Sequence, residues 1–230
     1  MVLNGWAASP DAWRDCTFRH DALYSYIELL DGLADGEMDY PGGVVLVGWS
    51  MGGSYALRLA LRRPEAVRAL VLIATTPRMM ESRAEGWKGM SPHRLEALRY
   101  GLKITGGKGL FEMGEGRPSP YVVDSDENLD RGLRYLVETD LREKLLASAS
   151  RFAGAGVSIV QSERDGVVRP ENASFLKGVF PHAAVDIVPG VEHALPATAP
   201  ERIDAAVAEA RGSALDHLLA KGEGHGFGSV

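Results

Sequence analysis

The stretch from Val44 to Gly53, Val-Val-Leu-Val-Gly-Trp-Ser-Met-Gly-Gly, constrains the fold of this chain more than any other. Its four successive aliphatic residues are typical of a parallel strand that is buried on both faces. A Gly-x-Ser-x-Gly turn follows, and residues 55–61 then have the apolar spacing of a helix. Strand, turn and helix in this order predict a nucleophilic Ser50, exposed at the carboxyl end of a sheet. The alternative is a glycine-rich turn whose serine has no catalytic role.

Length, composition and charge narrow the class of protein. The 230 residues fit one domain with room for an inserted subdomain. A net charge of −6 argues against a nucleic-acid binder. The single cysteine, Cys16, predicts no disulfide framework and a reducing compartment. Without a signal peptide or an apolar segment long enough for a bilayer, we expect a cytoplasmic monomer that does not bind membranes. We expect no metal and no cofactor.

Further buried-strand patterns recur along the chain and alternate with helical ones. They predict an α/β fold with a mostly parallel sheet flanked by helices. Between His20 and Leu33 the apolar residues have helical spacing, and a strand over Leu23–Leu29 is the alternative. The expected strands lie at residues 1–3, 44–47, 69–74, 157–160 and 184–188, and the closing helix at 200–210.

Residues 78–150 have no buried-strand run and are expected to form a helical cap. A helix starts at Ser91–Pro92, and shorter ones lie at 129–136 and 140–146. The core is therefore expected in two parts, residues 1–77 and 151–212, followed by a flexible C-terminal tail at 213–230. The Gly-rich run Gly106–Gly109 follows no strand and lacks a Gly-Lys-Ser/Thr ending, so we do not expect it to bind phosphate.

Three loops that follow strands carry the groups needed for acyl transfer. Ser50, Asp165 and His193 each follow a predicted strand, and the carboxyl ends of parallel strands meet at one edge of a sheet. His193 could take the serine proton, and an ionised Asp165 could orient the imidazole. The chain order Ser, Asp, His is that of one class of serine hydrolase. Four other acidic residues are weaker third members: Asp124, Asp126, Asp140 and Asp186. Glu192, next to His193, is expected at the rim of the site.

A developing oxyanion needs hydrogen-bond donors. The backbone N–H groups of Met51, which follows the nucleophile, and of Trp6, in the loop after the first strand, are the expected donors. We expect the side chains of Met51 and Trp6 to form walls of the acyl pocket.

Several motifs together resemble the α/β-hydrolase family, and within it the pimeloyl-acyl-carrier-protein methyl ester esterases of biotin synthesis. Those enzymes carry His-Gly-Trp-Gly, Gly-Trp-Ser-Leu-Gly-Gly and Leu-Asp-Gly-Leu-Val at matching points. The matching stretches here are Asn4–Ala7, Gly48–Gly53, Glu163–Val168 and Glu192–Ala194, with similar cap segments at Glu85–Pro92, Leu129–Leu136 and Thr139–Arg142. Asn4 replaces the usual His, and we expect the family's first two strands to be absent.

The resemblance implies a serine esterase that cleaves the methyl ester of pimeloyl-acyl-carrier protein through an acyl-serine intermediate. A general small-acyl esterase or thioesterase is the second possibility, and a non-catalytic ligand-binding protein of the same fold is the third. An acyl-carrier protein is acidic, so its docking site should be basic. From Arg78 to Arg117 the chain has eight basic and five acidic residues, an excess opposite in sign to the net charge.

Overall fold

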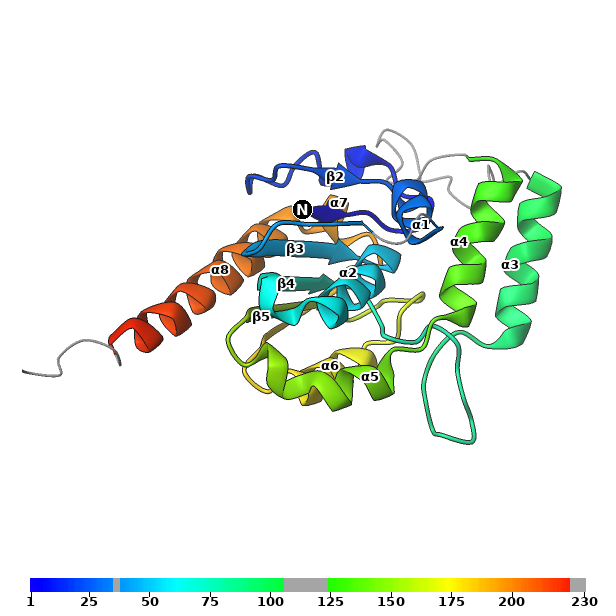
Figure 1. Cartoon of the computed structure of the whole chain (residues 1–230). Coiled ribbons are helices and arrows are strands. Elements are labelled where there is room, and N and C mark those ends of the chain that lie inside the picture. The colour runs from blue at the N-terminus through cyan, green and yellow to red at the C-terminus, as the bar shows by residue number, and fades with distance from the viewer. Residues whose placement is uncertain (35–37, 106–123, 224–230) are drawn as a thin grey trace, which may run out of the picture.

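A six-stranded sheet forms the centre of the protein (Figure 1). The computed structural model describes residues 1–34, 38–105 and 124–223. The strand order is β2-β1-β3-β4-β5-β6, and all neighbouring strands are parallel, which confirms the expected sheet. The strands are β1 (Val2–Leu3), β2 (Leu23–Tyr24), β3 (Val44–Trp49), β4 (Val67–Ile73), β5 (Gly156–Ser162) and β6 (Ala184–Val188).

Helices cover both faces of the sheet and extend from one end of it. The α-helices are α1 (Tyr26–Ala34), α2 (Met51–Arg62), α3 (Pro92–Thr105), α4 (Asp126–Glu138), α5 (Arg142–Ser148), α6 (Glu171–Val179), α7 (Leu195–Thr198) and α8 (Pro200–Glu223). Short 3-10 turns are η1 (Pro10–Trp13), η2 (Pro64–Ala66) and η4 (Ala149–Phe152).

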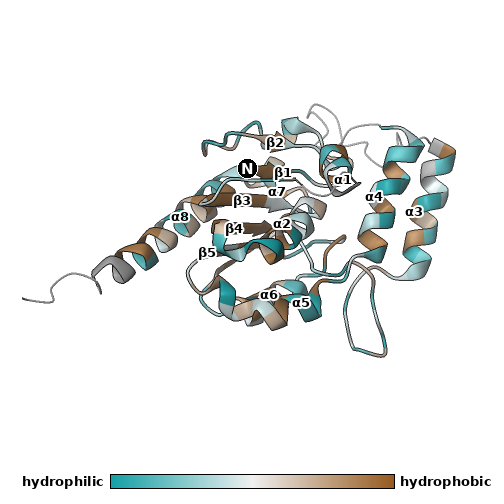
Figure 2. Ribbon diagram, in the orientation of Figure 1, coloured by the Kyte–Doolittle hydropathy of each residue, from teal (hydrophilic) through white to brown (hydrophobic). Residues whose placement is uncertain are grey.

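The central strands bury both of their faces, as their continuous apolar sequence predicts (Figure 2). On one face, Leu46, Leu72 and Ile159 belong to a core cluster with residues of α1, α2, α5 and α6. On the other face, Val71 and Val160 belong to a second cluster with residues of η1, α7 and α8. The alternation follows from the two-residue period of a strand and leaves only the strand ends for polar chemistry.

The segment expected as a cap leaves the sheet after β4. Helices α3 and α4 lie beyond the carboxyl end of β3 (Figure 1). At its base, Arg78 pairs with Asp140 in an antiparallel bridge, and their side chains lie 3.0 Å apart in an ion pair. Glu85 and Arg142 complete this charged network. The run Gly106–Gly109 lies outside the described residues.

Two local expectations need correction. The segment from His20 to Leu33 is neither wholly helix nor wholly strand, because β2 pairs with β1 before α1 begins. Ser25 marks the boundary: its hydroxyl accepts from Glu28 N, and Glu28 accepts from Ser25 N at 2.7 Å, which is a capping box. Helix α8 also continues to Glu223, so the segment after residue 212 begins as helix and not as a flexible tail.

In the part of the chain that the structure describes, no helix combines the length and apolar character needed to cross a bilayer.

Gly156 tests the packing of α8 on the sheet. A Cβ atom built at Gly156 would lie 1.8 Å from the carbonyl oxygen of Ala210. We expect Gly156→Ala to lower the free energy of unfolding by about 2 kcal/mol or more, because the helix backbone must move away. Urea unfolding measures this change.

Gly178→Ala on α6 is the matched control, since a Cβ atom there meets nothing within 4 Å. Its stability should stay the same or rise by about 0.5 kcal/mol, because alanine favours helix over glycine. Equal losses in both variants would contradict the proposed close packing.

Candidate active site

Ser50 lies at the sharp turn between β3 and α2. Its φ of 56° is in a region that non-glycine residues rarely adopt. Neighbouring strands and loops hold it there: Ser50 N donates to Ile73 O at 2.9 Å, and Thr75 Oγ1 donates to Ser50 O at 2.7 Å. The fold therefore fixes a conformation that the residue alone would avoid.

The glycines around Ser50 are required by close backbone approach. A Cβ atom at Gly48 would lie 2.5 Å from Gly52 O. One at Gly52 would lie 2.0 Å from Leu3 O, and one at Gly53 would lie 2.6 Å from the side chain of Thr75. Any side chain at these positions would push the turn away from β1 and from the loop after β4.

The structure brings Ser50, His193 and Asp165 together. His193 Nε2 lies 2.9 Å from Ser50 Oγ, and His193 Nδ1 lies 2.8 Å from Asp165 Oδ2. The three side chains come from loops after β3, β6 and β5. With Nδ1–H donating to the carboxylate, Nε2 has its lone pair directed toward the serine hydroxyl. This is the geometry in which a histidine can accept the serine proton.

Asp165 is held by several donors that keep it in place as an acceptor. Its side chain is fully buried. The backbone N–H groups of Val167 and Val168 each donate to Oδ1 at 2.8 Å, and Gln161 Nε2 donates to Oδ2 at 3.1 Å. Sequence reasoning missed Gln161, because an amide inside a buried strand looks like any other polar residue before its partner is known.

Besides its contacts with Ser50 and Asp165, His193 also contacts Trp49, the residue before the nucleophile. Trp49 Nε1 donates to the carbonyl oxygen of His193 at 3.0 Å, and the two rings lie 5.8 Å apart between centroids. The tryptophan of the Gly-Trp-Ser stretch therefore positions the histidine loop against the turn at Ser50.

Asn4 organises the loop after β1. Its side chain is fully buried. Oδ1 accepts from Gly5 N at 3.1 Å and from Trp13 Nε1 at 3.0 Å, and Nδ2 donates to Ala8 O at 3.0 Å. The Asn4 amide thus satisfies donors and acceptors of the loop itself, which lies against the nucleophile turn.

Trp6 connects this loop to α4. Its Nε1 donates to the carbonyl oxygen of Leu129 at 3.0 Å. A Cβ atom at Gly132, one turn later, would lie 2.2 Å from Trp6 Cδ1, so the indole lies directly against the helix backbone. Sequence reasoning missed this contact, because nothing in Leu129–Leu136 indicates that a distant side chain packs against Gly132.

A cavity of about 270 Å³ opens beside Ser50 and His193. It is bounded mainly by apolar side chains from the loop after β1, the segment before α3, α3 itself and α4: Trp6, Met79, Met90, Leu98, Leu133 and Leu136. Met51 differs from expectation, because its side chain is fully buried in the core. Its backbone N–H, in the first turn of α2, stays available as a candidate oxyanion donor.

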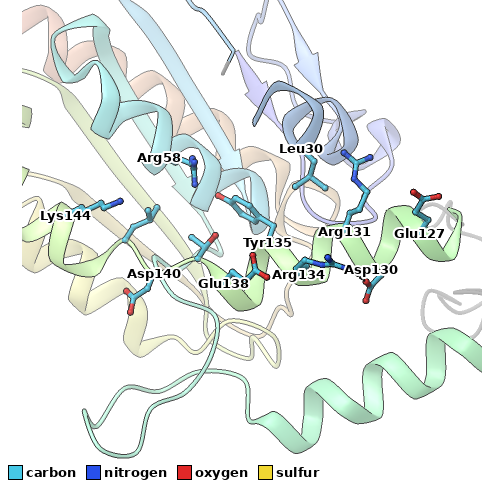
Figure 3. A pocket seen from close by; sticks show the side chains of 12 residues that line it. Leu30, Arg58, Glu127, Asp130, Arg131, Arg134, Tyr135, Glu138, Asp140 and Lys144 are labelled. Atoms are coloured by element: carbon cyan, nitrogen blue, oxygen red, sulfur yellow. Dashed lines mark hydrogen bonds and ion pairs between the residues drawn. The ribbon is translucent and has the colours of Figure 1, made fainter. Parts of the chain in front are cut away.

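A larger groove of about 840 Å³ runs along another face of α4 (Figure 3). Its walls are highly charged, and much of that charge is paired within the protein. Arg131 pairs with Asp31 at 2.6 Å, and Arg134 pairs with Asp130 at 3.0 Å. None of the three residues brought together around Ser50 lines this groove, so the acyl chemistry belongs to the smaller cavity.

Three of the other acidic candidates have structural partners. Asp186 pairs with Arg202, Asp140 with Arg78 and Arg142, and Asp124 accepts from the Tyr26 hydroxyl at 2.6 Å. Burial raises the pKa of the Cys16 thiol to about 12, which makes it a poor nucleophile. Within the described ranges, no group of three or more His, Cys, Asp and Glu side chains is arranged to hold a metal ion.

Comparisons with known proteins agree with this architecture. A model of the Alpha/beta hydrolase family matches residues 5–206. The pimeloyl-acyl-carrier-protein methyl ester esterase of Nitrosospira multiformis is 27% identical over 240 residues, covering 84% of this chain and 86% of that protein. The enzyme of the same name from Shewanella woodyi is 29% identical over 183 residues, covering 63% and 69%.

A solved structure shows the same fold. The bromoperoxidase from Bacillus anthracis has a TM-score of 0.63 and 18% sequence identity, and the match covers 95% of this chain and 91% of that chain. The fold and the family resemblance expected from the sequence are confirmed.

Gly132 tests whether α4 positions the loop that bears Trp6. We expect Gly132→Ala to lower kcat for an ester at least about tenfold, because the new methyl group displaces the indole and its backbone. Steady-state kinetics with a small methyl ester measure this, and the melting temperature reports on the fold.

Combining Gly132→Ala with Trp6→Phe removes the indole edge that the methyl group meets. Gly132→Ala should therefore lower kcat less in the Trp6→Phe background than it does in the unchanged protein. A loss of the same size in both backgrounds would mean that Gly132 acts without Trp6.

Proposed function

The chain belongs to the alpha/beta hydrolase family, and we propose that it is a serine carboxylic ester hydrolase with Ser50, His193 and Asp165 as its triad. The observation that carries this proposal is the His193 ring, which contacts the Ser50 hydroxyl through one nitrogen and the buried Asp165 through the other. The two relatives named as methyl ester esterases support the reaction class.

The reaction proceeds in two halves. Ser50 Oγ attacks the ester carbonyl carbon while His193 Nε2 takes the hydroxyl proton. The resulting oxyanion is stabilised by the backbone N–H groups of Met51 and Trp6. The intermediate collapses to an acyl-serine, and the alcohol leaves with the proton from His193. Water then attacks the acyl-serine with the same proton transfers, which releases the carboxylic acid and restores Ser50.

The surroundings of the triad support these roles. Asp165 accepts from two backbone N–H groups and from Gln161, so it can stabilise the imidazolium without moving. Ser50 is largely buried and borders the cavity lined by apolar side chains, which holds the acyl chain away from water.

For the substrate, we propose the methyl ester of pimeloyl-acyl-carrier protein, acted on in the cytoplasm. The names of the two relatives and the apolar acyl cavity support this choice. A general small-acyl esterase is the alternative, because a cavity of about 270 Å³ also admits a free ester.

The outer face of α3 provides a surface for the carrier. Tyr100 and Ile104 lie one turn apart and are 68% and 64% exposed. Lys103 is exposed beside them, in a segment with an excess of basic residues. Apolar contacts flanked by a cation suit an acidic partner.

Ser50→Ala tests the nucleophile. We expect the variant to fold normally and to hydrolyse a methyl ester at least about a thousandfold more slowly. Labelling by a fluorophosphonate probe should disappear in parallel. Turnover close to that of the unchanged protein would reject Ser50 as the nucleophile.

Docking of the carrier is tested with Lys103→Glu combined with Ile104→Asp. The preference for a carrier-bound ester over a free methyl ester should fall at least about fivefold, mainly at low salt, because the partner's negative surface is now repelled. The two kcat/KM values across salt concentrations give this preference.

The matched control lies on α5, where Leu146 is 57% exposed and Lys144 is also exposed. Lys144→Glu with Leu146→Asp changes charge and apolar area in the same way on another surface. A preference that stays constant in the α3 variant, or falls equally in the α5 variant, would remove α3 as the docking face.

A further inference from the structure

Arg94 is a charged side chain in the cavity that the hydrolytic reaction does not use. It lies in the first turn of α3 and lines the cavity beside Ser50 and His193. The remaining lining is mainly apolar. Resting on the proposed function, we propose that Arg94 selects esters whose acyl part carries an anionic group a short chain away from the reacting carbonyl.

The backbone of Arg94 is anchored, and its guanidinium lies near the loop after Asp165. Its backbone N–H donates to Ser91 Oγ at 3.3 Å, which anchors the first turn of α3. Its guanidinium extends to the loop that carries the triad carboxylate, since a Cβ atom built at Gly166 would lie 4.0 Å from Arg94 Nη2. The cation therefore lies between α3 and the loop after Asp165, at the rim of the cavity.

Arg94 has no carboxylate partner, unlike most arginines of the cap. Five of these arginines are paired with acidic side chains: Arg78, Arg99, Arg131, Arg134 and Arg142. Within residues 1–34, 38–105 and 124–223, the guanidinium of Arg94 forms no ion pair. Arg94 is exposed to solvent at the rim of the cavity, so its guanidinium is open to an anion, and salt should screen the attraction.

The size of the cavity limits where the anion can be. About 270 Å³ lies just below the usual range for pockets that enclose drug-sized ligands, roughly 300 to 1,000 Å³. A short acyl chain fills it, and the group that follows the chain reaches the rim. Guanidinium binds carboxylate and phosphate alike, with two parallel hydrogen bonds. The anion that this geometry suits is the far carboxylate of a dicarboxylic half-ester, a free ester of the small-acyl alternative, because the phosphate of a carrier's prosthetic arm lies a whole pantetheine unit beyond the acyl chain.

The test compares esters that differ only in charge. Monomethyl heptanedioate carries a free carboxylate, and its dimethyl ester is the neutral match. The thioester of the half-ester with 4′-phosphopantetheine carries a phosphate, and the thioester with pantetheine is its neutral match. We expect Arg94→Gln to lower kcat/KM for the half-ester about tenfold relative to its neutral match, through KM and less so at high salt. Arg94→Lys should retain part of this preference.

Arg83→Gln is the control, because Arg83 is exposed, belongs to the same cap segment and does not line the cavity. It changes the net charge equally and should leave both preferences as they are. A preference lost for the half-ester supports the proposal, and one lost only for the phosphopantetheine pair would place the anion beyond the cavity and overturn it. Equal losses on charged and neutral esters, or no loss on either pair, would overturn the proposal.

Binding separates this proposal from the proposed function. In the Ser50→Ala background, calorimetry with heptanedioate and with 4′-phosphopantetheine measures anion recognition without turnover. If Ser50→Ala still hydrolyses esters, the triad assignment fails, and weaker binding of heptanedioate in Ser50→Ala with Arg94→Gln would still support Arg94. If heptanedioate does not bind more weakly in that double variant, the role of Arg94 is rejected and the triad is unaffected.

Discussion

The contact between the first turn of α2 and β1 is the constraint on which the site depends. Gly52 lies so close to the carbonyl oxygen of Leu3 that no side chain fits between them. This approach forces the chain to reverse within a few residues of β3, and the reversal gives Ser50 its positive φ. Because the turn is tied to β4 through Ile73 and Thr75, the serine hydroxyl has a fixed direction before any substrate arrives.

The sequence predicted the parts of the site that depend on strand ends. Ser50, Asp165 and His193 each follow a strand, and parallel strands bring their carboxyl ends to one edge whatever lies between them. The same reasoning could not separate β2 from α1. There, Leu23 and Tyr24 pair with β1 at the edge of the sheet, and this tertiary contact outweighs the helical spacing of their side chains. The helix itself begins only after Ser25.

Other parts of the site depend on specific side-chain contacts that strand patterns do not reveal. Gln161 holds Asp165, Asn4 holds the loop before Trp6, and Gly132 makes room for the indole of Trp6. The roles of Gln161 and Asn4 depend on side-chain hydrogen bonds to residues close in the chain, and Gly132 acquires its role from Trp6, far away in the chain. Helix α4 thus supports the loop at Trp6, and α3 contributes Arg94 to the cavity, so the cap segment forms part of the site.

Helix α8 covers one face of β4 and β5, and its carbonyl at Ala210 lies over Gly156. It follows all six strands in the chain, so a ribosome makes every strand before it makes the helix that shields them. Until then, valines and isoleucines of the nascent sheet face water or a chaperone. The sheet can pair its strands during synthesis, but that apolar face is protected only after residues near 210 have left the exit tunnel.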